Sequence, residues 1–241
     1  MKIAAIIPAR YNSTRFPGKP LAILGKNPII QHVYERTKNS GIFDEIIVAT
    51  DDQRIFDAVE NFGGKVVFTS PKHKSGTDRV AEVCSKLDCD IAVNIQGDEP
   101  FISEKPLLKL ISVFENKEIE VASLMHKIQK NVNNPNNVKV VCDEDNFALY
   151  FSRAAIPFPR DSEATKISYY KHIGVYAFRK EILMRFVQLP VGKLERIEKL
   201  EQLRLLENGI KIKMVETDYR GIGIDTPADL REAEKILKKQ I

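Results

Sequence analysis

The sequence has few cysteines and no hydrophobic segment that could cross a membrane. No apolar run approaches the roughly 20 residues of a transmembrane helix, and no charged, apolar and small-residue pattern of a secretory signal is present. The three cysteines, Cys84, Cys89 and Cys142, cannot all form disulfides. Cys84 and Cys89 also lack a second cysteine pair that would complete a zinc site. We therefore expect buried free thiols, a reducing compartment and a cytoplasmic protein.

The charge balance gives no sign of a surface that binds nucleic acid. Lys and Arg number 37 against 33 Asp and Glu, so the net charge is only +4. No basic run resembles the stripe expected of a nucleic-acid-binding protein, and the lysines at 238–239 match the C-terminal end of a helix. The cations near the N-terminus therefore point to a small anionic ligand.

Two common nucleotide-binding motifs, GxxxxGK[ST] and GxGxxG, are also absent. Instead, an apolar run at residues 3–7 is followed by Arg10, Arg15 and Lys19, with small and hydroxylated residues between them. A continuous β-branched run predicts a buried parallel strand, and open α/β sheets bind ligands at the carboxyl ends of such strands. The loop therefore predicts a polyphosphate site, although its residues alone are equally compatible with a solvated basic turn.

The first 116 residues alternate between strand and helix patterns. We expect strands at residues 3–7, 45–50, 65–69 and 90–95. Helices are expected at residues 28–39, after a cap at 51–52, from 77 or 78 to 87, and at 104–116. This alternation predicts a parallel, doubly wound sheet.

The pattern changes in the middle third of the chain. Strands are expected at residues 120–125, 138–142, 148–152 and 172–178, with a loop at 156–168. They predict an antiparallel insertion at about 127–190, suited to a lid or a dimer contact. One helix at 193–208, strands at 210–215 and 221–224, and a last helix at 228–239 should follow. We therefore expect one α/β domain, 1–241, with a doubly wound mixed sheet of Rossmann-like type.

Two acids follow strand-like segments and are candidate magnesium ligands. Asp98 lies in the segment 96–100 that directly follows the strand expected at 90–95, and Asp225 lies between the strand expected at 221–224 and the last helix. A carboxylate beside a polyphosphate suits magnesium, a hard cation that prefers oxygen ligands. Each acid has a plainer explanation, since Asp98 could be a turn or cap residue and Asp225 could cap the last helix.

Three further features could carry function. The loop at 73–79 (HKSGTDR) either reads a nucleobase edge or is an exposed capping loop. Arg153 follows an apolar strand, where a buried cation would need an anionic partner. His172 begins another strand, and a single histidine is most often structural.

Eight segments together resemble one enzyme family. In chain order they are residues 7–20 (IPARYNSTRFPGKP), 73–79 (HKSGTDR), 94–100 (NIQGDEP), 137–141 (NVKVV), 148–157 (ALYFSRAAIP), 172–178 (HIGVYAF), 200–204 (LEQLR) and 223–227 (GIDTP). The opening loop is shared with other nucleotidyltransferases, but the whole set is highly specific and spans essentially the whole chain. The sequence resembles the 3-deoxy-manno-octulosonate cytidylyltransferases, also called CMP-Kdo synthetases.

This resemblance implies a nucleotide-diphospho-sugar transferase fold and transfer of CMP from CTP to the anomeric hydroxyl of Kdo (3-deoxy-D-manno-octulosonate). Pyrophosphate is released, and the product feeds lipopolysaccharide synthesis in Gram-negative bacteria. The implied nucleotide-binding residues are Ala9, Arg10, Ser13, Arg15, Lys19, Ser75, Gly76 and Arg79. Asp98 and Asp225 would hold magnesium and, with Arg10 and Lys19, carry catalysis. The implied sugar-acid residues are Gln96, Arg153, His172, Tyr176, Glu201 and Gln202, although 200–204 is equally explained as part of an amphipathic core helix.

Two alternatives stay open at this point. The same chemistry could act on another sugar acid, such as 8-amino-Kdo or a sialic-acid-like sugar. The chain could also be a catalytically silent CTP-binding module, although the pair Asp98 and Asp225 favours an enzyme. We expect a homodimer through the insertion, and neither nucleic acid nor membrane as a partner.

Overall fold

The structure, a computed structural model, describes residues 1–13, 15–160 and 167–239 of the 241-residue chain. It divides into two compact units: the first unit comprises residues 1–108 and 221–241, and the second unit comprises residues 109–220. The insertion predicted at about 127–190 falls within the second unit. Residues 161–166 of that insertion, and Thr14 of the N-terminal loop, lie outside the described residues.

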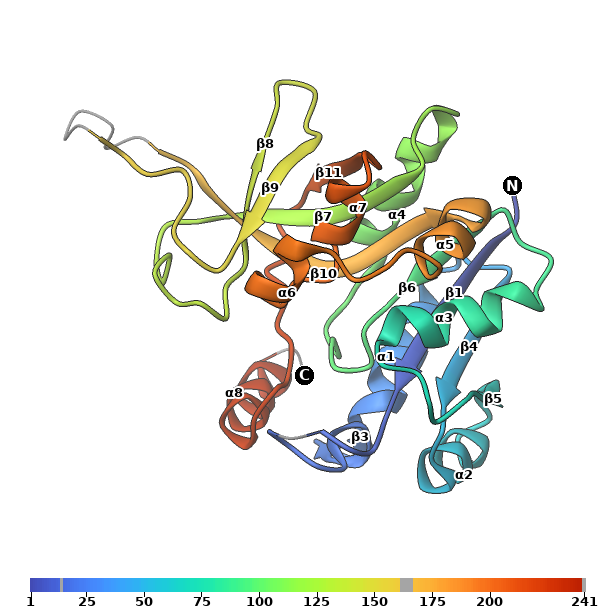
Figure 1. The fold of residues 1–241 in the computed structure, drawn as a ribbon. Coiled ribbons are helices and arrows are strands. Elements are labelled where there is room, and N and C mark those ends of the chain that lie inside the picture. The colour runs from blue at the N-terminus through green and yellow to red at the C-terminus, as the bar shows by residue number, and fades with distance from the viewer. Residues whose placement is uncertain (14, 161–166, 240–241) are drawn as a thin grey trace. The chain divides into compact units, whose positions relative to one another are not determined.

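The first unit is built on a parallel sheet. Its strands are β1 (Ile3–Ala9), β4 (Glu45–Thr50), β5 (Val66–Phe68) and β6 (Ile91–Asn94), in the spatial order β6-β1-β4-β5 (Figure 1). Helices α1 (Ile29–Asn39), α2 (Gln53–Asn61) and α3 (Gly76–Ser85) alternate with these strands along the chain. The predicted β-α alternation is therefore confirmed. Because chain order reverses between β1 and β6, their carboxyl ends form the switch point at which such sheets bind ligands.

Local sequence explains why these elements form. All seven residues of β1 are buried, as expected of a central strand with helices on both faces. Asp52 caps α2 by accepting a hydrogen bond from the backbone N–H of Arg54 at 3.0 Å. Ser75 and Asp78 form a capping box at the start of α3.

The end of the chain completes the first unit. A short turn, η1 (Lys19–Leu21), a hairpin of β2 (Ile23–Leu24) and β3 (Asn27–Pro28), and the last helix, α8 (Pro227–Lys238), belong here. Helix α8 packs against the hairpin, because a Cβ on Gly25 would lie 2.7 Å from the Leu237 side chain. The strand predicted at 221–224 is wrong. This segment is irregular, and its Ile224 backbone N–H donates to the carbonyl of Asp98 at 2.9 Å.

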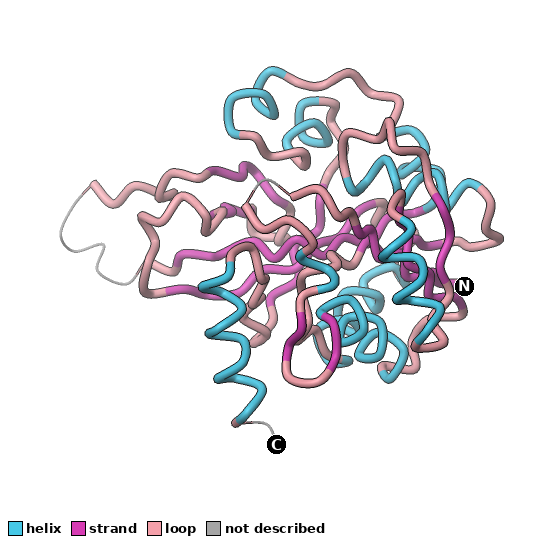
Figure 2. The backbone as a smooth tube through the Cα atoms, turned by 90° about the horizontal axis from the view of Figure 1, so that it is seen from below, coloured by secondary structure: helices cyan, strands magenta, loops and turns pink. Residues whose placement is uncertain are grey.

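The second unit contains a mixed sheet. Its strands are β7 (Val121–Ile128), β8 (Lys139–Cys142), β9 (Ala148–Ser152), β10 (Tyr169–Arg179) and β11 (Ile212–Glu216). Helix α4 (Glu104–Ser112) and the turn η2 (Val113–Glu115) lead into it along the chain. Strand β10 pairs antiparallel with β7 and β8, β8 pairs antiparallel with β9, and β11 is parallel to β7. Figure 2 shows these strands in magenta, and the predicted antiparallel pairing is confirmed.

The single helix predicted at 193–208 is wrong. The segment forms two short helices, α6 (Lys193–Glu198) and α7 (Leu203–Glu207), after a further helix, α5 (Lys180–Phe186), that was not predicted. Lys199 ends α6 in a left-handed conformation with φ of 54°. The bend is stabilised by the guanidinium of Arg204, which binds Glu195 at 2.6 and 2.7 Å. Within the described ranges, every helix is too short or too polar to span a membrane.

Candidate active site

A cavity of about 300 Å³ opens in the first unit at the carboxyl ends of β1 and β6. Its lining residues are Pro8, Ala9, Arg10, Ser13, Arg15, Lys19, Pro20, His73, Lys74, Ser75, Gly76, Arg79, Gln96, Gly97, Asp98 and Asp225. This set contains all eight residues implied for the nucleotide, both implied magnesium ligands, and Gln96 from the implied sugar-acid set. Five cationic and two carboxylate side chains belong to this described lining, a surplus of three positive charges. The cavity is therefore chemically suited to a polyanion.

Lys19 connects the two acids at the centre of this site. Its Nζ donates to Asp98 Oδ2 at 2.5 Å and to Asp225 Oδ1 at 3.2 Å. Only 13% of the Lys19 side chain is exposed. Burial opposes the charge of this ammonium, but attraction to Asp98 and Asp225 outweighs burial and raises the pKa of Lys19. Lys19 therefore stays protonated, and its single positive charge is shared between the two carboxylates.

Asp225 belongs to this cluster and does not cap the last helix. Thr226 caps α8, with its side chain accepting from the backbone N–H of Asp229. The Asp225 carboxylate instead contacts Lys19 and the guanidinium of Arg15, the latter at 3.1 Å. The helix-capping explanation of Asp225 is thus wrong, and its carboxylate is directed toward the cationic loop.

The two carboxylates fit a magnesium ion. Oxygens of Asp98 and Asp225 lie within 3.2 Å of one ammonium nitrogen, so they converge on a point that already holds a positive charge. Magnesium is commonly held by one or two carboxylates together with water and substrate phosphates. No group of three or more His, Cys, Asp or Glu in the described part of the chain is placed to hold a metal. The donor set thus suits an ion shared with a phosphate ligand.

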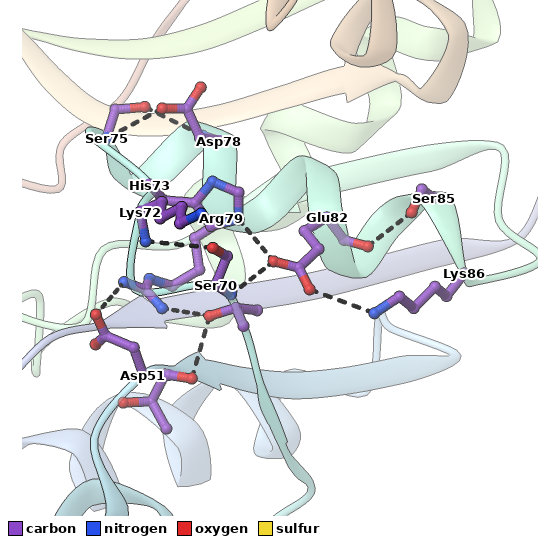
Figure 3. Close-up of polar contacts among 12 residues, drawn as sticks. Asp51, Ser70, Lys72, His73, Ser75, Asp78, Arg79, Glu82, Ser85 and Lys86 are labelled. Carbon is purple, nitrogen blue, oxygen red and sulfur yellow. Dashed lines mark hydrogen bonds and ion pairs between the residues drawn. The ribbon is translucent and has the colours of Figure 1, made fainter.

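The loop before α3 is fixed by an ion pair and by hydrogen bonds (Figure 3). The Arg79 guanidinium, only 5% exposed, contacts Asp51 at 3.0 Å and also donates to the hydroxyl of Thr69. His73 binds Glu82 at 2.6 Å. The backbone N–H of Ser70 lowers the pKa of Glu82 most strongly, and despite opposing burial the pKa falls to about 2. Because Asp51 and Thr69 hold its guanidinium, Arg79 fixes the start of α3, where Ser75 and Gly76 lie.

Two of the implied sugar-acid residues contact each other in the second unit. His172 and Tyr176 on β10 have ring centroids 5.2 Å apart, and the Ser123 hydroxyl lies 3.0 Å from His172 Nε2. Burial, with repulsion from Lys171, lowers the pKa of His172 to about 3. His172 is therefore neutral near physiological pH and can offer a hydrogen bond but no charge. Burial likewise raises the pKa of Tyr176 well above its ordinary value.

Arg153 directly follows β9 and lies among backbone carbonyls. Its Nε donates to the carbonyl of Glu198 at 2.8 Å, and one terminal nitrogen donates to the carbonyl of Pro135 at 2.9 Å. Glu201 and Gln202 lie between α6 and α7, where Glu201 is 3.7 Å from the Arg204 guanidinium. Gln202 is buried. The roles of these residues toward a sugar acid stay predictions.

Comparison with known proteins decides the family. A family model described as cytidylyltransferase matches residues 4–212. The 3-deoxy-manno-octulosonate cytidylyltransferase of Flavobacterium johnsoniae is 52% identical over 99% of both chains, and that of Thermodesulfovibrio yellowstonii is 52% identical over 98% of both. The chain belongs to the 3-deoxy-manno-octulosonate cytidylyltransferase family.

Solved structures agree with this membership. A CMP:2-keto-3-deoxy-manno-octonic acid synthetase complexed with CTP is 44% identical over the whole of both chains, with a TM-score of 0.95. A 4-diphosphocytidyl-2C-methyl-D-erythritol synthase from Anaerococcus prevotii is only 18% identical, with a TM-score of 0.65, and shares the fold. The family resemblance and the mixed α/β fold predicted from the sequence are both confirmed.

Five residues that line the cavity of this cytidylyltransferase family member are not among the site residues implied by the sequence: Pro8, Pro20, His73, Lys74 and Gly97. A Cβ on Gly97 would lie 3.0 Å from the carbonyl oxygen of Pro8, so a side chain there would crowd the Pro8 backbone. A Cβ on Gly76 would lie 3.3 Å from the Pro8 ring. Pro8 and Gly97 thus form a narrow wall of the cavity. The available signal was a glycine two residues after the strand expected at 90–95, because glycine permits a close backbone approach.

Proposed function

We propose that this protein transfers CMP from CTP to Kdo, giving CMP-Kdo and pyrophosphate for lipopolysaccharide synthesis. The observation that carries this proposal is the first-unit cavity. It gathers Arg10, Lys19, Asp98 and Asp225 at the carboxyl ends of β1 and β6 in a chain of this family. A cationic cavity with two converging carboxylates fits a nucleoside triphosphate and magnesium.

Electrostatics accounts for most of the chemistry expected here. Both substrates are anions, so their approach requires positive charge. Arg10 and Arg15 would neutralise the phosphates, while Lys19 is kept protonated by its carboxylate partners. Nucleotidyl transfer depends mainly on positioning and charge neutralisation, without a covalent enzyme intermediate. The three cysteines are accordingly outside the cavity lining.

The reaction is a displacement at the α-phosphorus. The anomeric hydroxyl oxygen of the sugar acid bonds to this phosphorus, and the bond from the α-phosphorus to the bridging oxygen breaks. The hydroxyl proton passes to solvent, and pyrophosphate takes the electron pair of the broken bond. The start of α3, with Ser75 and Gly76 and fixed through Arg79, would hold the nucleotide in position for attack.

Magnesium is part of this proposal, with Asp98 and Asp225 as its protein ligands. When bound, it would supply positive charge to the phosphates and the attacking oxygen. Lys19 would then give up part of its contact with the two acids and turn toward the triphosphate. Asp98 and Asp225 would thus balance the charge of Lys19 when the site is empty and the charge of magnesium when substrates are bound.

The sugar acid is assigned to the remaining implied residues. These are Gln96, Arg153, His172, Tyr176, Glu201 and Gln202. Arg153 supplies the cation for the carboxylate of the sugar, and His172, which stays neutral, supplies a hydrogen bond to a hydroxyl.

Assembly and location form a further part of the proposal. Phe158, Ile197 and Leu149 of the second unit are 84%, 69% and 61% exposed in the isolated chain. Exposed apolar side chains of this size favour a contact with a second copy, so we propose a homodimer. A monomer mass in solution would contradict it. The free cysteines favour a cytoplasmic enzyme.

Pyrophosphate release with CTP, magnesium and Kdo tests the function. We expect release that requires all three, with CMP-Kdo as the second product. Binding of CTP without turnover would instead support a silent nucleotide-binding module. Competition between Kdo, 8-amino-Kdo and a sialic acid at equal concentration tests the acceptor, and preference for another sugar acid would overturn the assignment to Kdo.

A further inference from the structure

Lys139, on β8 of the second unit, is a lysine with no exposed surface. Burying an ammonium is costly unless hydrogen bonds replace the lost water. Its Nζ donates to the backbone carbonyls of Asn137 at 2.5 Å, Arg153 at 2.6 Å and Asn134 at 3.2 Å. These three contacts use all three N–H donors of the ammonium. Every N–H of the Lys139 ammonium is therefore bonded within the protein, so Lys139 has no donor left to bind a substrate.

These carbonyls tie two separate segments together. Asn134 and Asn137 belong to the loop before β8, and Arg153 directly follows β9. The side chain of Arg153 returns to the same loop, because one of its terminal nitrogens donates to the carbonyl of Pro135 at 2.9 Å. Lys139 therefore links the backbone of Arg153 to the 134–137 loop. The Arg153 guanidinium contacts the same loop at Pro135.

The other contacts of Arg153 fix the opposite side of its guanidinium. Nε donates to the carbonyl of Glu198 at 2.8 Å, and the second terminal nitrogen donates to that of Lys199 at 3.4 Å. The Glu198 carboxylate also accepts from the backbone N–H of Arg153 at 3.0 Å. The guanidinium thus lies between the α6 end and the 134–137 loop. Only the loop side depends on Lys139.

We propose that Lys139 is a positioning residue, whose buried ammonium fixes the 134–137 loop and thereby orients the Arg153 guanidinium toward the carboxylate of the sugar acid. This inference rests on the proposed function, in which Arg153 binds that carboxylate. Without the ammonium, three backbone carbonyls lose a charged donor, and the loop has to shift to find new partners. Arg153 then keeps its charge but loses its orientation.

The central experiment is steady-state kinetics of Lys139→Met, which keeps the length and volume of the side chain and removes the donors. We expect KM for Kdo to rise at least about tenfold, because a misplacement of ~1 Å can cost about a hundredfold. KM for CTP should stay within about twofold, since the nucleotide residues belong to the first unit. Equal changes in both KM values, or no change in KM for Kdo, would overturn the proposal.

Lys213→Met is the control for loss of a single, exposed lysine–carbonyl contact. Lys213 lies in the same unit, and its ammonium also donates to a backbone carbonyl, that of Asp145, which does not contact Arg153. We expect its KM for Kdo to equal that of the unmodified protein. A rise similar to that of Lys139→Met would show that losing any lysine–carbonyl contact loosens the unit, which contradicts a specific role.

A double-mutant cycle separates positioning from general stability. If Lys139 acts through Arg153, Lys139→Met should add less than about twofold to the KM for Kdo of Arg153→Ala. Full additivity would overturn the proposal. Should Lys139→Met fail to fold in circular dichroism, Lys139→Gln, which keeps two N–H donors, is put through the same cycle with the same criteria. Failure of the proposed function is distinct, because the unmodified protein would then release no pyrophosphate with Kdo.

Discussion

Replacing Asp98 by asparagine tests the role of the carboxylate pair while preserving the shape of the side chain. In the folded protein Asp98 Oδ2 accepts from Lys19 at 2.5 Å, and Lys19 is 13% exposed. Removing one partner of a buried ion pair typically costs about 3–5 kcal/mol. Here Asp225 still neutralises Lys19 from 3.2 Å, and the new amide oxygen still accepts a hydrogen bond. The expected loss is therefore only about 1–2 kcal/mol, nearer to one hydrogen bond.

The effect of the same substitution on turnover should be much larger. Asp98 is one of the two carboxylates proposed to hold magnesium, so Asp98→Asn removes half of the protein's charged ligands. We expect kcat/KM to fall at least about a hundredfold, which corresponds to about 2.7 kcal/mol of transition-state stabilisation. A folded but nearly inactive enzyme is the predicted combination, because domains of this kind have about 5–15 kcal/mol of stability to lose from.

The assay measures initial rates of pyrophosphate release over a range of Kdo concentrations at saturating CTP and at several magnesium concentrations, alongside urea unfolding. Asp90→Asn is the control, since Asp90 accepts from the backbone N–H of Lys2 at 2.7 Å and is not part of the cavity lining. It should keep normal rates. If Asp98→Asn retained a rate within about threefold of the unmodified protein, with the same magnesium dependence, Asp98 would have no place in the metal site.

Three further substitutions test other parts of the structure. Arg153→Ala should raise KM for Kdo more than KM for CTP in steady-state kinetics, and an equal rise would exclude a specific contact with the sugar. Asp51→Ala leaves buried Arg79 without its ion-pair partner, but the Thr69 hydroxyl still accepts from Arg79, so the free energy of unfolding in urea should fall by about 2 kcal/mol rather than by the full value for a buried pair; unchanged stability would contradict this. Glu82 has a pKa of about 2, below its ordinary value of 4.5, so its stabilising effect is present above the unfolded pKa and lost as pH falls toward 2. The stability difference between the unmodified protein and Glu82→Gln should therefore shrink over that range, and a constant difference would refute the assignment.

Hydrophobic patterning predicted most of the strands, because burial determines where they form. The strand expected at 45–50 has the bounds of β4 (Glu45–Thr50), and the one at 148–152 has those of β9 (Ala148–Ser152). The helix at 193–208 failed for a tertiary reason. A left-handed lysine at 199 and the pairing of Glu195 with Arg204 are not visible in helical periodicity.

The site was predictable in its residue types but not in its geometry. Cations and acids at strand ends suggested a phosphate site, and all of the nucleotide residues implied by the resemblance line one cavity. The contact of Lys19 with Asp225 joins positions 206 residues apart, which no local pattern encodes. Pro8 and Gly97 were missed because close backbone approach depends on the folded neighbourhood rather than on residue chemistry.

At the interrupted helix around Lys199, a change that raises stability is expected to lower activity. The last carbonyls of a helix lack partners within it, and those at the end of α6 are taken by Arg153. Replacing Lys199 by a residue that prefers the right-handed conformation would favour continuation of the helix. The carbonyls of Glu198 and Lys199 would then accept hydrogen bonds within the helix and would no longer accept from Arg153. Variants selected for heat resistance alone would thus be drawn toward a continuous helix here, while losing the acceptors that orient Arg153. When variants at position 199 are selected for heat resistance, they should therefore also be screened for turnover.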